Sequence, residues 1–258
     1  MNNNAMLNKN ITCEQKGTDY FYPAEDRKLL CMMFDEINQK TGSDIHYLAE
    51  IDSLIIPGSG EIVNKYITKF SSESVKGYLI QQMVADRIID CDDLILQLYL
   101  QFKRSKEYVA EPGQPSPAHI YVRYDNAFNV LKSRRIEKEL IDVVRNPRDA
   151  FYLPLTVCML ASWKKPEMLD VLIRYLSEKD FIELDVENCG AQIYPPKEFM
   201  VRELRFSAIN GLKYYPSQET KVLLEPFAVD ENKDIQSAAK RTLKAISKQL
   251  TRNGCLQT

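Results

Sequence analysis

Apolar residues recur every three to four positions along nearly the whole chain, and this helical spacing constrains the fold more than any other feature. The first such segment, 24–40, begins after Pro23 and ends before Gly42, which are typical helix start and stop signals. The apolar residues of one of its faces are Leu29, Leu30, Met33, Phe34 and Ile37. We therefore expect a helix over 24–40.

The same spacing predicts a series of further helices, most of them separated by short polar connectors. They cover 43–51, 61–70, 72–89, 92–109, 121–132, 134–144, 149–163, 166–177, 197–214, 217–229 and 233–250. Because short connectors make neighbouring helices run antiparallel, we expect an all-α protein composed of successive helical hairpins.

One segment departs from the helical period. Over 181–187 apolar and acidic residues alternate, as in a strand with one buried face. Asn188-Cys189-Gly190 is a turn sequence, and a return strand would end at Tyr194. We predict a small β-hairpin near residues 181–194, inserted into the helical chain.

The C-terminal part contains an internal repeat. The segments 197–214 and 233–250 superpose with a shift of 31 residues, which aligns Leu204-Arg205 with Ile235-Gln236. The preceding segments, 166–177 and 217–229, match with a shift of 51 residues because 177–196 is an insertion. Small residues in the repeat would let neighbouring helices lie close together, namely Ser207, Ala208, Ala238 and Ala239.

This pattern resembles the HEAT-repeat (armadillo-like) family of α-solenoids. In that family an acidic turn precedes a second helix that begins with an apolar–Arg pair. Asp230 stands in the turn here and Leu204-Arg205 matches the pair, whereas Gln236 and Pro154 depart from it. The resemblance implies stacked hairpins with a concave face and two edges. A generic helical bundle is the alternative.

The chain is expected to have four parts. Residues 1–22 form a polar segment, 23–91 a helical region of degenerate repeats or a cap, 92–250 the HEAT-like repeats, and 251–258 a tail. The two long connectors, 110–119 and 177–196, are expected to emerge at the same edge. In the second, the candidate partner-binding residues are Phe181, Glu183, Asp185, Glu187 and Tyr194.

The chain contains few residues of the types that commonly act in catalysis. The chain has 2 histidines and 1 tryptophan, and its 6 cysteines lack CxxC spacing, so we expect reduced thiols, no catalytic residues, no metal site and no cofactor. Pro57-Gly58-Ser59-Gly60 is interpreted as the turn before a helix. Arg134 and Arg135 are weak candidates for anion binding.

Charge is unevenly distributed along the chain. Residues 1–100 contain 9 basic and 15 acidic residues, whereas 197–258 contain 11 basic and 7 acidic residues. The acidic N-terminal part disfavours binding of nucleic acid along the whole chain, although the basic C-terminal end could contact it locally. We expect a cytoplasmic protein that does not act at a membrane.

The scarcity of residues suited to catalysis and the expected concave face with its two edges favour a non-enzymatic function. HEAT-like proteins commonly act as scaffolds, adaptors or inhibitors, so the resemblance implies a protein-binding scaffold or an immunity-type inhibitor with an unidentified protein partner. The alternative is a HEAT-like DNA-binding protein or DNA glycosylase. For that chemistry the nearest residues are Trp163, Asp170 and Arg174.

Overall fold

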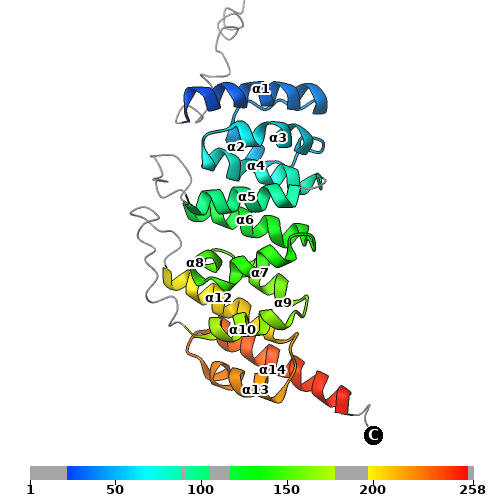
Figure 1. Cartoon of the computed structure of the whole chain (residues 1–258), viewed down its shortest axis with the longest axis vertical. Coiled ribbons are helices and arrows are strands. Elements are labelled where there is room, and N and C mark those ends of the chain that lie inside the picture. Colours follow the sequence, from blue (N-terminus) through cyan, green and yellow to red (C-terminus); the bar gives the residue numbers. More distant parts are fainter. Residues whose placement is uncertain (1–21, 89–90, 105–116, 178–196, 255–258) are drawn as a thin grey trace, which may run out of the picture. The chain divides into compact units, whose positions relative to one another are not determined.

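The computed structural model describes residues 22–88, 91–104, 117–177 and 197–254 of the chain. These residues fold into two compact units, unit 1 ending at Leu131 and unit 2 beginning at Lys132 (Figure 1). Every regular element of the described residues is a helix, which confirms the all-α prediction. The predicted β-hairpin near 181–194 lies outside the described residues.

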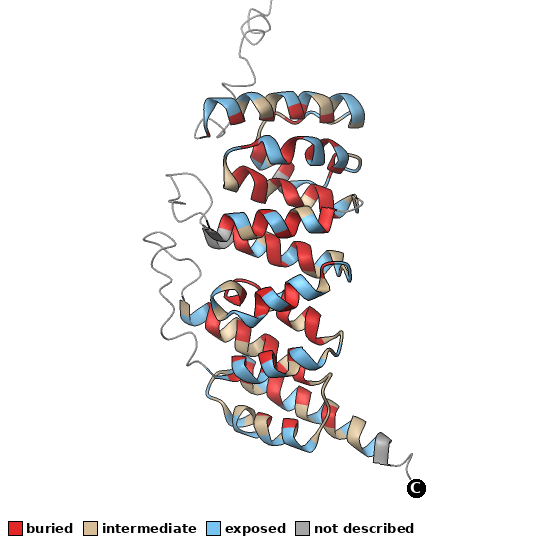
Figure 2. Ribbon diagram, in the orientation of Figure 1, coloured by how far each residue is buried: buried red, intermediate tan, exposed pale blue. Residues whose placement is uncertain are grey.

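Unit 1 is built around one central helix, α4, which packs against α2, α3, α5 and α6. The α-helices of the unit are α1 (Ala24–Thr41), α2 (Leu48–Ser53), α3 (Gly60–Tyr66), α4 (Glu73–Ala85), α5 (Cys91–Arg104) and α6 (Pro117–Leu131). A short 3-10 helix, η3 (Ile67–Lys69), continues α3. Most residues of α4 are buried, and Figure 2 draws this helix largely in red.

The first helix begins and ends where the sequence predicts. It follows Pro23, and Gly42 closes it in the left-handed conformation with φ 72°. The Gly42 N–H donates to the Asn38 carbonyl at 2.9 Å. An L side chain is strained at this φ, so glycine at this position ends the helix at little cost.

The next helix starts later than expected. The spacing predicts a helix from Ser43, whereas α2 begins at Leu48. The Glu50 carboxylate accepts the His46 N–H at 2.7 Å and the Tyr47 N–H at 3.3 Å. These bonds fix the start of α2 at Leu48, which is buried in the core together with Ile51.

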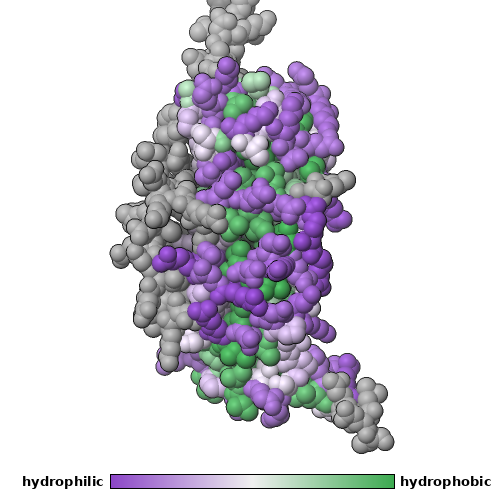
Figure 3. Space-filling view, in the orientation of Figure 1, coloured by the Kyte–Doolittle hydropathy of each residue, from purple (hydrophilic) through white to green (hydrophobic). Residues whose placement is uncertain are grey.

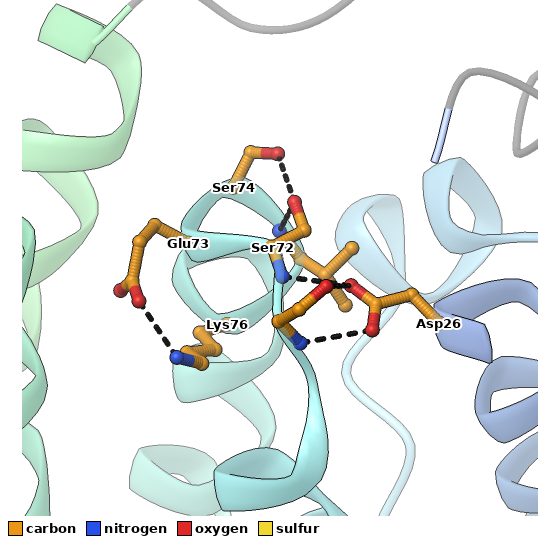
Figure 4. A network of polar contacts seen from close by, with 7 residues as sticks. Asp26, Ser72, Glu73, Ser74 and Lys76 are labelled. Atoms are coloured by element: carbon orange, nitrogen blue, oxygen red, sulfur yellow. Dashed lines mark hydrogen bonds and ion pairs between the residues drawn. The ribbon is translucent and has the colours of Figure 1, made fainter. Parts of the chain in front are cut away.

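A buried carboxylate joins the start of α1 to the start of α4 (Figure 4). Asp26 is 1% exposed and accepts the backbone N–H groups of Ser71 at 2.8 Å and Ser72 at 2.7 Å. The Ser71 hydroxyl also donates to it at 3.1 Å. Ser72 in turn caps α4, accepting the Val75 N–H at 3.4 Å. One side chain therefore anchors two helix starts that are more than forty residues apart in sequence.

An aromatic cluster fills the core between α5 and α6. Tyr99 makes edge-to-face contacts with Tyr121, Tyr124 and Phe128, with ring centroids 5.5 to 6.0 Å apart. Phe102 adds a tilted contact with Tyr121 at 4.7 Å. Such pairs add specific geometry to the burial of apolar area, and they fix how α5 lies on α6.

In unit 2, α12 packs against α9, α10 and α14. The α-helices are α7 (Glu137–Arg145), α8 (Pro147–Ala150), α9 (Pro154–Ala161), α10 (Pro166–Leu176), α12 (Lys197–Leu212), α13 (Gln218–Leu224) and α14 (Lys233–Gly254). The 3-10 helix η5 (Glu225–Val229) links the last two. The small residues of the repeat are all buried in this packing, namely Ser207, Ala208, Ala238 and Ala239.

The single helix expected over 149–163 is wrong, because this segment is interrupted. The short helix α8 is capped by Asn146, whose side chain accepts the Arg148 N–H at 3.0 Å, and a second helix, α9, starts only at Pro154. Proline has no N–H to donate and suits the first turn of a helix, so the chain restarts there. Pro154 thus divides the predicted helix in two.

The cysteines agree with expectation only in part. Cys91 and Cys158 are free thiols, and burial raises the pKa of Cys91 to about 11. Cys31 is disulfide-bonded, contrary to the expectation of reduced thiols, and its partner lies outside the described residues. Pairing depends on which thiols meet in space, which cysteine spacing alone did not indicate. In the described part of the chain, no helix combines the length and apolar content of a membrane span.

Candidate functional site

The predicted edge residues Phe181, Glu183, Asp185, Glu187 and Tyr194 all lie in 178–196, outside the described residues. Their role in partner binding therefore stays a prediction. The other predicted residues, Arg134 and Arg135, lie just before α7 and are both exposed.

Arg134 belongs to a cluster of internal contacts. Its guanidinium donates to Glu137 at 2.7 Å and lies over the Trp163 ring, 4.1 Å from the centroid. Lys165 contacts the other oxygen of the Glu137 carboxylate at 2.5 Å. Two cations therefore share one carboxylate, and the Arg134 side chain is already engaged by the protein. The Arg135 N–H donates to the Ser133 hydroxyl at 3.2 Å.

The electrostatics of this cluster depend on Glu137. Burial alone would raise the pKa of the Glu137 carboxyl, but the hydrogen bonds from Lys165 and Arg134 outweigh it and hold the pKa below its ordinary value. The group is therefore ionised at neutral pH. The cluster acts as a charged tie between the segment before α7 and the connector that precedes α10.

The Pro57–Gly60 turn is interpreted from sequence as the start of a helix, and α3 does begin there. An internal carboxylate occupies its N–H groups: Asp86 at the end of α4 accepts Gly58 at 3.1 Å and Gly60 at 2.6 Å. A Cβ on Gly60 would come within 2.8 Å of the Gln82 carbonyl oxygen, so glycine permits this close approach. The turn already has an anion and binds it for structural reasons.

A buried ion pair on α4 lies near the buried Tyr124 hydroxyl of α6. Lys76 donates to Glu73 at 2.7 Å, as Figure 4 shows, and both side chains are largely buried. The other Glu73 oxygen and the Tyr124 hydroxyl are buried and have no hydrogen-bond partner among the described residues. Burial raises the pKa of Tyr124 well above its usual value, with the Glu73 charge adding to the effect. This hydroxyl is therefore uncharged and contributes little to stability.

Among the described residues of unit 2, α14 has the longest run of basic residues that no acidic residue interrupts. The segment from Lys240 to Arg252 has five basic residues and no acidic one. All five are exposed, and we call them the α14 cationic face: Lys240, Arg241, Lys244, Lys248 and Arg252. The sequence shows a basic C-terminal end, but the common helix face of these charges was not predicted. Lys240, Lys244, Lys248 and Arg252 follow one another every four residues, and Arg241 is three residues before Lys244, which places all five on one side of the helix.

The two histidines lie on different segments of unit 1. His46 lies 2.9 Å from Asp44 at the surface, and His119 lies on α6. Among the described residues, no group of three or more His, Cys, Asp and Glu side chains is arranged to hold a metal ion.

Comparisons with known proteins found no relative of this chain. No protein-family model matches the chain, and no curated protein or solved structure is significantly similar to it. The function proposed below is therefore inferred from the residues and contacts of this chain alone.

Proposed function

We propose that the chain is a non-enzymatic, HEAT-like protein-binding scaffold. The observation that carries this proposal is a repeated tie between helices of unit 2. Arg174 on α10 donates to the carbonyl of Arg145, the last residue of α7, at 3.1 Å. Arg205 on α12 donates to the carbonyl of Leu176, the last residue of α10, at 3.2 Å.

The two ties have the same spacing along the chain. Arg174 and Arg205 are 31 residues apart, as are their acceptors, although the sequence repeat itself aligns α10 with α13 and α12 with α14. One shift further, Gln236 on α14 donates to the Asp230 carbonyl at 3.2 Å, but this acceptor is only six residues away, so the bond is local and does not continue the series. Each tie satisfies a C-terminal carbonyl that the helix itself leaves unpaired. Repetition of one tie supports an architecture extended by adding hairpins.

A repeat architecture suits binding because its helices contact mainly their neighbours and leave extended faces exposed. The repeated ties would hold those faces in a fixed arrangement, which reduces the entropy lost when a partner binds. Edge connectors on such a support would then provide specificity. An immunity-type inhibitor of one protein is a narrower form of the same proposal.

The alternative of a HEAT-like DNA glycosylase has weaker support. Of its nearest residues, Trp163 has its ring under Arg134, and Arg174 donates to the Arg145 carbonyl. Both side chains are thus engaged in internal contacts. Asp170 and Arg174 are both exposed, and a carboxylate on an exposed helix surface does not form a base-binding pocket.

The scaffold proposal is tested on the full chain by capture of protein partners from native cytosol, followed by mass spectrometry. The test variant carries F181A, E183Q, D185N, E187Q and Y194A in the predicted edge connector. The matched control carries E139Q, E167Q and D170N, three carboxylates that are exposed on the helices of unit 2.

We expect the edge variant to lose the partner while the control retains it, with helical circular dichroism unchanged in both. Capture by the edge variant at the wild-type level would overturn the assignment of the edge residues. If no protein is captured specifically by the wild-type chain, the scaffold proposal itself fails.

A further inference from the structure

We propose that α14 binds the phosphate backbone of double-stranded nucleic acid through the α14 cationic face. This inference goes beyond the proposed function, because it concerns another partner and another surface. It begins from the geometry of one helix. At 3.6 residues per turn, the five basic residues fall within an arc of about 120° around the α14 axis.

The opposite side of α14 is fully used in packing. Its buried residues are Ile235, Ala238, Ala239, Thr242 and Ile246, which occupy a separate arc of about 100°. This side lies against α12, α13 and η5. The fold therefore fixes α14 with its cationic face outward. Figure 1 shows the C-terminal end of α14 extending past α13.

The charges of this face are available to a partner. None of the five side chains forms an ion pair or hydrogen bond within the described residues, whereas Arg134 and Lys165 share Glu137. The acidic residues nearest in sequence are Glu231 and Asp234, at or before the start of α14. They lie at least six residues before Lys240, which separates them from the cationic face by more than one helical turn.

The length of the face suits contact with a duplex. Lys240, Lys244 and Lys248 follow one another every four residues, which is about 6 Å along the helix axis. The whole face extends over about 18 Å, a length in which a DNA duplex presents about ten phosphate charges. A regular row of unpaired cations can therefore meet phosphates without any readout of base sequence.

A protein partner fits this face less well. Surface ion pairs contribute little affinity, and a stable protein interface needs buried aromatic or apolar anchors. The exposed large apolar residues of the described chain lie on other elements, such as Val222 on α13 and Val229 on η5. Binding to nucleic acid needs no such anchor, because release of counterions from the phosphates supplies the free energy.

Two other anionic partners are also disfavoured. Helices that bind membrane surfaces insert an apolar face between the lipids, and the apolar face of α14 is buried in the fold. Proteins that bind single strands stack bases on aromatic side chains, and α14 contains no aromatic residue. A duplex, recognised by its backbone alone, remains the partner that suits the face.

The test measures binding of the full chain to fluorescently labelled 24-bp duplexes of random sequence, one of DNA and one of RNA, over a series of salt concentrations. With five phosphate contacts, log K should fall with log salt with a slope of about −4.5 on DNA. The variant K240Q/K244Q/K248Q should weaken binding more than about tenfold at low salt and reduce the slope to about −2.

Two matched variants accompany it. K132Q/K138Q/K164Q removes the same charge from exposed lysines elsewhere in unit 2, and it should bind as the wild type does. K240R/K244R/K248R keeps the charge of the face and should also retain binding. Helical circular dichroism should be the same for all variants, since every substituted side chain is exposed.

Four results would overturn the inference. They are no duplex binding at low salt, equal losses in the two glutamine variants, binding to phosphatidylserine vesicles or polyglutamate but not to a duplex, and preference for a single strand over both duplexes. Preference for DNA or for RNA identifies which duplex is the partner. None of these results bears on protein capture by the edge connector, so the two proposals fail separately.

Discussion

Arg134 lies over the Trp163 ring, with its guanidinium carbon 4.1 Å from the ring centroid. The same guanidinium donates to the Glu137 carboxylate at 2.7 Å. One residue thereby joins an aromatic face and a carboxylate. The two residues that sequence analysis assigned to different functions, anion binding and base recognition, are each other's partners. Their contact serves the packing of unit 2.

This contact has an optical signature, since Trp163 is the only tryptophan of the chain. Replacing Arg134 with alanine removes the cation from the ring, so we expect a shift of the fluorescence emission maximum. The free energy of unfolding should fall by about 1 kcal/mol. The control K138A, a nearby exposed position, should leave the emission unchanged. Identical spectra for R134A and wild type would contradict the contact.

The Glu137 carboxylate should make the stability of unit 2 depend on acid pH. Its folded pKa lies below its ordinary value because Lys165 and Arg134 bind the ionised form. A lowered pKa contributes stability above the unfolded value and loses it as pH falls through the folded value.

Urea unfolding of E137Q should therefore show a loss of about 1 kcal/mol at pH 7 that shrinks as the pH falls from about 5 to 3. The same difference between E137Q and wild type at both ends of this range would show that the ionised carboxylate is not the source.

Asp26 should be among the most sensitive positions of unit 1. Alanine at this position leaves the N–H groups of Ser71 and Ser72 and the Ser71 hydroxyl without their acceptor in a buried place. We expect D26A to lower the free energy of unfolding by about 3 kcal/mol. The neighbouring E25A, at an exposed position, should change it by less than about 0.5 kcal/mol in the same urea titration.

Two buried tyrosines should respond differently to loss of the hydroxyl. Tyr175 donates to the Val144 carbonyl, so Y175F should cost about 1 kcal/mol. The Tyr124 hydroxyl has no hydrogen-bond partner in the part of the chain that the structure describes, so Y124F should be neutral or stabilising. Thermal unfolding of the two variants side by side measures the contrast. Equal destabilisation by both would mean that the Tyr124 hydroxyl has a partner.

Much of the local structure could be predicted from sequence. The helical period, the stop at Gly42 and the small residues of the repeat are local patterns, and the structure agrees with them. The prediction of one helix over 149–163 is wrong because the apolar period does not show the effect of Pro154. Proline has no N–H to donate within a helix, so a new helix begins at this residue. The predicted edge residues lie outside the described structure and stay predictions.

The sequence by itself determined that the described chain is helical and where most of its helices lie, because periodicity and capping act between residues a few positions apart. Only the tertiary structure decided that Asp26 binds Ser72, that Asp86 binds Gly60, and which face of α14 is exposed. Those contacts join residues from different helices. A charged side chain has the same appearance in sequence whether it is solvated or bonded, and packing alone brings its partner to it.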